Sequence, residues 1–271
     1  MASGFILAFH SHSISGATYA TNDHVALDES IALVQRLRIP VLRLLDVVKE
    51  LRRGAFATLP ERFVCLTFDD GADYDWVDTR HAEQGMQPSM HSILRRHSRR
   101  LIGPWWLRKA CGTSFVIASP AARRDMEAAL PVRLSDTWWP EAQASGLLDI
   151  GSHGWDHVHP AVSEMKSRPE LIESFHKIDS GEEAQLQMDC AYEFIRRMTG
   201  SDSARLFAYP YGQVSEFIAN EYLPGQKHYW AAFTTEARPL HEDCNIWQLP
   251  RYVCGWNWKS AEELGKLLSD G

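Results

Sequence analysis

The chain has 271 residues, of which 45% are hydrophobic and 23% are charged, the balance of an ordinary globular protein. This length is enough to bury a large core and suits one α/β domain of barrel size. The formal net charge of -7 argues against nucleic acid or an anionic membrane surface as the main partner.

The cysteines and the first residues bear on the compartment. The five cysteines are odd in number and scattered, and none forms a Cys-x-x-Cys pair, so they predict neither a disulfide framework nor a zinc knuckle. The N-terminus lacks the basic segment of a signal peptide, and its apolar run is too short for one. No apolar stretch approaches the roughly 20 residues that span a bilayer. We therefore expect a cytoplasmic protein.

Short apolar strands alternate with amphipathic helices along the chain. Strands are predicted at residues 5–9, 63–68, 113–117, 147–150, 206–209, 230–234 and 246–249. Apolar residues at helical spacing predict helices over 41–53 and 184–198, and Ser119-Pro120 opens another. This alternation implies a parallel sheet, closed as a barrel, in one domain over residues 1–271.

A long polar stretch rich in histidine and arginine follows the second strand, from residue 72 to about 100. A charge run of this kind is typical of a solvated helix face. The alternatives are a lid over a site or a contact for an anionic substrate.

Two adjacent carboxylates, Asp69 and Asp70, end the strand at 63–68. The C-terminal end of a buried parallel strand is where α/β folds place their sites. Successive side chains on extended backbone point to opposite sides, so one carboxylate can bind a metal while the other handles a proton. Taken alone, Asp-Asp-Gly is also an ordinary polar turn.

Two histidines four residues apart, His153 and His157, follow the strand at 147–150. On a helical turn their imidazoles would point the same way. Two such imidazoles and one carboxylate are the three protein ligands of an open catalytic zinc site. Because this pair and the two aspartates each follow a strand, we expect them on the same rim of the sheet.

A turn of sequence Tyr-Pro-Tyr-Gly follows the strand at 206–209 and carries Tyr211. The proline and glycine fix a turn in which a backbone N–H can face the site and stabilise an oxyanion. A proline turn with a packed tyrosine is the structural alternative.

Together these motifs resemble the polysaccharide deacetylase family, the NodB-homology group known as carbohydrate esterase family four. The segments at 67–71, 152–157 and 207–212 carry the resemblance, which extends from about residue 5 to about residue 252. It implies a distorted (β/α) barrel and metal-dependent removal of the acetyl group from an N-acetylated sugar. Carried over residue by residue, it implies that Asp70, His153 and His157 bind the metal and that Asp69 is the general base. Zinc is the expected ion, with cobalt or another divalent metal left open.

Two departures from the family pattern concern the proton donor and the orientation of the base. Many members have an arginine before the Pro-Tyr-Gly turn and a late Leu-x-His that supplies the acid, and this chain has neither. Both departures resemble the branch that acts on poly-N-acetylglucosamine, in which a strand ending in Tyr-His supplies the acid. The matching His10 is therefore the expected acid, with His12 and His241 as alternatives, and Arg251 is a candidate to orient Asp69.

The segment from 72 to 108 is longer than the family usually carries here, and we expect it to be an insertion that shapes the substrate pocket. The expected partner is an N-acetylated sugar or glycan precursor inside the cell. A non-sugar amide such as a cyclic ureide, or a sugar-binding pseudoenzyme without turnover, stays open. The sequence does not indicate the oligomeric state.

Overall fold

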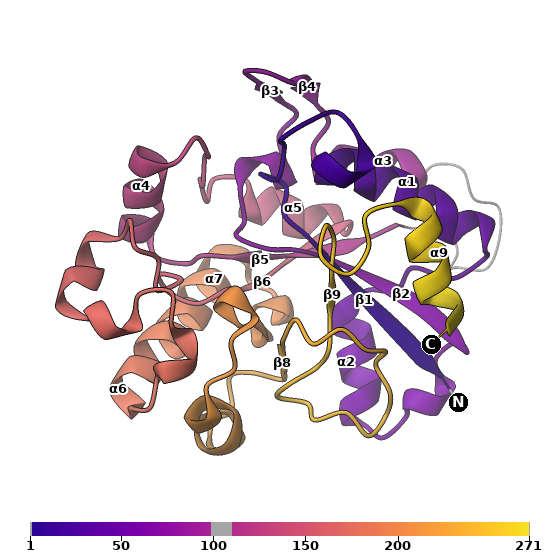
Figure 1. The fold of residues 1–271 in the computed structure, drawn as a ribbon. Coiled ribbons are helices and arrows are strands. Elements are labelled where there is room, and N and C mark those ends of the chain that lie inside the picture. Colours follow the sequence, from indigo (N-terminus) through magenta and orange to yellow (C-terminus); the bar gives the residue numbers. More distant parts are fainter. Residues whose placement is uncertain (1, 99–109, 271) are drawn as a thin grey trace.

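A curled parallel sheet forms the centre of the molecule in the computed structural model, which describes residues 2–98 and 110–270 (Figure 1). Its seven strands lie in the order β8-β7-β6-β5-β2-β1-β9, and every pairing is parallel. The strands are β1 (Ser3–Phe9), β2 (Arg62–Phe68), β5 (Gly112–Val116), β6 (Leu148–Ser152), β7 (Leu206–Ala208), β8 (Ala231–Phe233) and β9 (Tyr252–Val253). The predicted distorted (β/α) barrel is confirmed.

The closure of this barrel differs from the expectation. The predicted strand at 246–249 is wrong: the segment forms a single bridge, between Phe233 and Leu249. The N–H of Leu249 donates to the carbonyl of Ala232, and the carbonyl of Leu249 accepts from the N–H of Thr234. The carbonyl of Thr234, which would take the next ladder bond, accepts instead from Nε of the Arg251 side chain. The chain turns instead to the opposite edge, where β9 pairs with β1. One irregular segment therefore contacts β8 at one sheet edge and leads into β9 at the other.

Helices cover the sheet along most of its length. They are α1 (Asp23–Arg36), α2 (Leu44–Arg52), α3 (Met90–Ser98), α4 (Pro120–Ala129), α5 (Trp139–Ser145), α6 (Gly181–Ala184), α7 (Ala191–Thr199), α8 (Leu223–Gly225) and α9 (Ala261–Asp270). None of the helices in the described part of the chain has the length and apolar character needed to cross a bilayer.

Local signals explain where several helices begin and end. Ser119 caps α4 by accepting a hydrogen bond from the N–H of Ala122, as the Ser-Pro pair predicted. The predicted helix over 184–198 is a continuous helical run, in which a π-helical segment, Gln185–Cys190, joins α6 to α7. Gly200 ends this run with a φ of 65°.

The strands bury side chains on both faces, which is why they are almost continuously apolar. In β1 all seven residues are buried, with Phe5 and Leu7 packed in one hydrophobic cluster and Ile6 in another. The second cluster includes Val48 of α2, which lies against this face of the sheet. Residues on the two faces alternate, as expected of parallel strands covered on both sides.

The polar stretch after β2 folds as a small hairpin, β3 (Thr79–His81) and β4 (Gly85–Gln87), followed by α3. The hairpin stands at the top of Figure 1, above α1 and α3. Arg95 and Arg96 of α3 are exposed, so the prediction of a solvated helix face is confirmed there. The last part of the predicted insertion, residues 99–108, lies outside the described residues.

Candidate active site

The polar residues predicted from the sequence gather where the parallel strands end. His10 follows β1, Asp69 and Asp70 follow β2, His153 follows β6, and Tyr211 lies in the turn after β7. All of them, with His157, line one cavity of about 820 Å³. The expectation of a common rim at the carboxyl ends of the strands is met for these residues.

Asp69 is held by a buried arginine from the other end of the chain. Arg251 donates from Nη1 to one carboxylate oxygen (2.7 Å) and from Nη2 to the other (2.8 Å), and neither side chain is exposed by more than 5%. The guanidinium also donates to the carbonyl of Thr234 (3.0 Å). Burial raises the pKa of Asp69, but the charge and hydrogen bonds of Arg251 outweigh it and hold that pKa below its usual value. Asp69 is therefore a fixed anion able to accept a proton.

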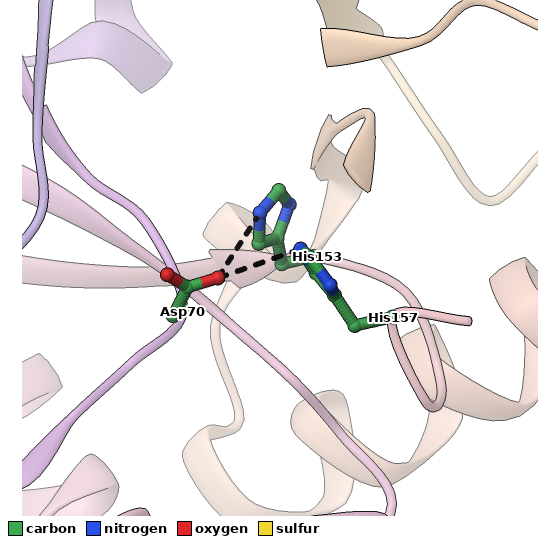
Figure 2. A group of neighbouring side chains, drawn as sticks. All are labelled: Asp70, His153 and His157. Carbon is green, nitrogen blue, oxygen red and sulfur yellow. Dashed lines mark ion pairs between the residues drawn. The ribbon is translucent and has the colours of Figure 1, made fainter. Parts of the chain in front are cut away.

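A left-handed turn gives Asp70 a different direction from its neighbour. Asp70 has a φ of 73° and Gly71 a φ of 70°, and a Cβ at Gly71 would lie 2.6 Å from Val116 Cγ1. Only glycine fits there. The turn brings Asp70 Oδ1 to 3.6 Å from His153 Nε2 and 3.4 Å from His157 Nε2, and Figure 2 shows both contacts meeting at this oxygen.

The two histidines converge through a loop and not through a helical turn, so that detail of the prediction is wrong. His157 itself has a φ of 60°, and Gly154 has a φ of 85°. The imidazole centroids are 4.7 Å apart. His153 donates from Nδ1 to the carbonyl of Ala208 (2.8 Å), which leaves the lone pair of Nε2 facing Asp70. Burial lowers the pKa of His157 to about 3, so its imidazole is neutral and available as a ligand.

A buried polar network that the sequence analysis missed supports this loop. Asp156 accepts hydrogen bonds from the N–H of Val158 (2.9 Å) and from Gln187 Nε2 (2.6 Å). Its second oxygen pairs with Arg168 Nη2 (2.5 Å), and Arg168 also pairs with Glu183. Because Val158 directly follows His157 and has a φ of 43°, these bonds stabilise the left-handed backbone that carries the second histidine.

The residues Asp70, His153 and His157 fit a divalent metal ion. Among residues 2–98 and 110–270, they are the one group of three metal-ligating side chains whose ligand atoms all lie within 4.8 Å of one another. Two donors that each lie about 2.1 Å from one tetrahedral ion are about 3.4 Å apart, close to the observed oxygen–nitrogen separations. Two neutral imidazoles and a carboxylate are also the donor set of open catalytic zinc sites.

The three histidines considered as acids occupy different places. The rings of His10 and His12 are 5.8 Å apart, and both line the cavity. His12 Nδ1 lies 3.6 Å from Asp70, and the side chain of His12 is 39% exposed. His241 instead points Nδ1 toward the carbonyl of Ala2 (3.5 Å), at the opposite end of β1 from His10. The structure therefore does not bring His241 to the site.

Tyr211 lies directly against a proposed metal ligand. Its ring centroid is 4.4 Å from that of His157, and its φ of 58° turns the peptide at the cavity wall. The following Gly212 also has a positive φ, and a Cβ there would lie 2.0 Å from Thr235 Oγ1. The turn is therefore packed tightly beside the histidines. The oxyanion role of the Tyr211 backbone stays a prediction.

The remaining walls of the cavity come from segments that the sequence analysis did not connect with the site. One wall is apolar and comes from α4 and the segment after it; it consists of Met126, Leu130, Pro131, Val132 and Leu134. Another is the turn after β9, with Val253, Trp256 and Asn257. Of the predicted insertion, the described residues 72–98 contribute nothing to this lining. Its role in shaping the pocket therefore stays a prediction.

Comparisons with known proteins agree with this arrangement. The family model for polysaccharide deacetylase matches residues 107–223, which include His153, His157 and Tyr211. The resemblance to the polysaccharide deacetylase family is thereby confirmed. The match supports an enzyme that acts on N-acetyl amides of sugars.

Solved structures share the fold over nearly the whole chain. Streptococcus pyogenes deacetylase PplD in complex with acetate aligns with a TM-score of 0.67 at 15% identity, covering 98% of each chain. A de-N-acetylase from Aggregatibacter actinomycetemcomitans aligns at 0.63 and 17% identity, covering 98% of this chain and 99% of that one. IcaB from Ammonifex degensii gives the same score and identity, with 99% and 97% covered. A comparison with curated protein sequences finds no match.

Proposed function

We propose that the chain is a metal-dependent hydrolase that cleaves the N-acetyl amide of an amino sugar, in a saccharide or glycan precursor, and releases acetate. The observation that carries the proposal is the pairing of a buried, arginine-held carboxylate, Asp69, with the ligand group of Asp70, His153 and His157 in one cavity. The family match supports the amide bond as the target. The products are acetate and the free amine.

The metal half of the site supplies electrophilic assistance. Asp70, His153 and His157 would hold the ion, with Zn²⁺ as the best match to their chemistry. A bound divalent ion lowers the pKa of water and polarises the amide carbonyl. The hydrogen bond from His153 to Ala208 fixes which ring nitrogen is free for that role.

The proton transfers fall to residues on the other side of the cavity. Asp69 accepts the proton of the attacking water as a C–O bond forms at the acetyl carbon. His10 then gives a proton to the nitrogen as the C–N bond breaks, which lets the amine leave. Arg251 keeps Asp69 anionic and oriented for the first step. The backbone of Tyr211 is the proposed donor to the oxyanion.

The two departures from the common family pattern guide the choice of substrate. His10 at the end of β1 lines the cavity, and Arg251 pairs with Asp69. His10 matches the acid that the resemblance to the poly-N-acetylglucosamine branch implies. We therefore propose N-acetylglucosamine units as the first substrate to test.

The test is acetate release from a panel of N-acetylated sugars by protein stripped of metal and then reloaded with zinc or cobalt. Acetate that appears only with metal supports the proposal, and Asp70→Asn, which loses a ligand, should abolish it. The substitution Asp202→Asn, at a half-exposed surface pair with Arg196, is a matched control that should not. Stoichiometric metal binding without acetate from any sugar would instead favour a non-sugar amide or a pseudoenzyme.

A further inference from the structure

An exposed tryptophan stands at the rim of the candidate active site. Trp256 is 87% exposed, more than any other large hydrophobic residue among those the structure describes, and it lines the same cavity as His10 and Asp69. Exposing an indole to water is unfavourable. A large exposed apolar side chain at the edge of a cavity therefore indicates a surface that binds a ligand.

The turn that carries Trp256 is held in one conformation by its own hydrogen bonds. The carbonyl of Val253 accepts from the N–H of Trp256 (3.2 Å) and of Asn257 (2.9 Å). Asn257 Oδ1 in turn accepts from the N–H of Val253 (2.6 Å). Gly255 allows the turn through its φ of 81°. The exposed ring is therefore presented by a preorganised backbone and not by a loose loop.

A buried tryptophan anchors this turn to the strand that ends in the proposed acid. Trp258 is fully buried, donates from Nε1 to the hydroxyl of Tyr19 (2.8 Å) and packs edge-on against Phe9. The N–H of Cys254 donates to the carbonyl of Ala8, two residues before His10. The position of Trp256 is thus fixed relative to the reacting groups.

The cavity has room for more than the reacting acetamido group. Its volume of about 820 Å³ lies in the range of about 300–1,000 Å³ that holds whole drug-sized ligands. Gln213, Thr235 and Asn257 add hydrogen-bonding groups to the lining, which suits a ligand with several hydroxyls. No lysine or arginine lines the cavity among the described residues.

We propose that Trp256 forms a stacking subsite for a second sugar unit, next to the one whose acetamido group lies at Asp69. The C–H groups on one face of a pyranose ring form an apolar surface that packs on the electron-rich face of an indole. A substrate of at least two sugar units would then gain a contact that a free monosaccharide cannot make. This inference rests on the proposed function, because the first sugar is placed by its acetamido group.

The kinetic test uses N-acetylglucosamine and its oligomers of increasing length. Trp256→Ala should lower kcat/KM for the oligomers by about tenfold, mainly through KM, while the value for the monosaccharide stays unchanged. Trp256→Phe, which keeps an aromatic face, should recover most of the loss. Met86→Ala removes another exposed side chain, 64% exposed on β4 and away from the cavity, and should change neither value.

Two kinetic outcomes would overturn the subsite. An equal loss with monosaccharide and oligomers would place Trp256 at the reacting sugar or give it a structural role. An unchanged kcat/KM at every length would show that the indole contacts no substrate.

A binding measurement separates failure of the subsite from failure of the proposed function. Oligosaccharide added to metal-free protein should change the intrinsic fluorescence of the native chain, because the sugar covers the indole of Trp256. The change should be smaller in Trp256→Phe, whose fluorescence comes from the other nine tryptophans. This readout needs no turnover. A Trp256-dependent signal without acetate release would keep the subsite and reject the deacetylase. Acetate release with identical fluorescence changes in both proteins would keep the deacetylase and reject the subsite.

Discussion

Asp69 and Asp70 are neighbours in the chain but lie in opposite surroundings. Asp69 faces a guanidinium that satisfies both of its oxygens, and its side chain is 5% exposed. Asp70 faces only imidazoles, at 3.4–3.6 Å, and its side chain is 17% exposed. One carboxylate already has its cation within the fold, and the other is arranged with neutral donors around a point where a cation fits.

The difference shows how one strand end can supply two functions. The pKa of Asp69 lies below its usual value because of Arg251, and the pKa of Asp70 is lowered as well, so both carboxylates are anions at neutral pH. What separates them is the left-handed turn at Asp70 and Gly71, which points one toward Arg251 and the other toward the histidines. Breaking either side alone is therefore the way to test the division of labour.

The largest effect is expected from Asp69→Asn. The amide cannot accept the proton of the attacking water, so turnover should fall by about 10⁴-fold, the upper range for a general base. Metal affinity should stay unchanged, because Asp69 contributes no ligand in the arrangement with Asp70. Steady-state kinetics and metal titration check the two statements. Turnover within tenfold of the native chain would reject Asp69 as the base.

Removing the partner of Asp69 should mainly destabilise the fold. Arg251→Met leaves a buried carboxylate without its cation, which costs about 3–5 kcal/mol of unfolding free energy at neutral pH. Urea denaturation measures the loss. The matched control is Arg53→Met, which breaks an exposed pair with Glu50 and should cost at most about 0.5 kcal/mol.

The pH dependence gives this comparison a second readout. The folded state lowers the pKa of Asp69, so its ion pair contributes stability at pH values above the unfolded pKa, about 4, and loses it as the pH falls through the lower folded pKa. In Arg251→Met the raising effect of burial is opposed by His153 and His10 but no longer by the guanidinium, so the pKa of Asp69 should rise. The acidic limb of kcat/KM should therefore move to higher pH. An unmoved limb would show that Asp69 does not set it.

The two histidines at the end of β1 should give different effects. His10→Ala should lower turnover by about 100-fold, through loss of the acid, and leave metal affinity unchanged. His12 lies 3.6 Å from Asp70, so His12→Ala should raise the metal Kd by a larger factor than it lowers kcat. The comparison uses kcat and the metal Kd for both variants. A large loss of kcat in His12→Ala alone would make His12 the acid.

The sequence was sufficient to predict which polar groups gather at the ends of the strands. The apolar run before Asp69 and Asp70 predicted a strand with the two carboxylates at its end. The spacing of His153 and His157 predicted that their imidazoles point the same way. It predicted that direction for the wrong reason, because a loop with positive φ at His157 replaces the helical turn. The local pattern identified the carboxylates and imidazoles of the site. It did not predict the backbone conformation that brings the two imidazoles together.

The parts that the sequence could not predict depend on residues far apart in the chain. Asp156 meets Gln187 across 31 positions, and Arg251 meets Asp69 across 182. The sequence analysis named Arg251 as a candidate to orient Asp69, and no local signal pointed to the contact of Asp156 with Gln187. The strand expected at 246–249 failed because Ile246 and Leu249 make a few backbone hydrogen bonds to residues 232 and 234, and only one bridge forms in place of a continuous ladder. Nothing in the sequence distinguished Trp256 from the other nine tryptophans, and only the fold shows that its side chain is exposed.

The smallest effect is expected from the network that supports the proposed metal ligand His157. Asp156→Asn keeps an oxygen for the N–H of Val158 but removes the charge that faces Arg168, which retains its pair with Glu183. The loop at His157 should become less well fixed, and metal affinity should fall by about tenfold, as for other groups that orient ligands. A metal titration and the absorption spectrum of the cobalt form measure the change.

The comparison with Arg251→Met then decides whether the two halves of the site are independent. Asp156→Asn should leave the acidic limb of kcat/KM in place, and Arg251→Met should leave the metal Kd in place. Because the two networks share no partner, their effects on unfolding free energy should add in the double variant. Non-additive losses of unfolding free energy would mean that the turn at Asp70 and Gly71 transmits strain from one side of the site to the other. Asp69 and Asp70 would then differ in their chemical partners, and the fold would not keep their surroundings independent.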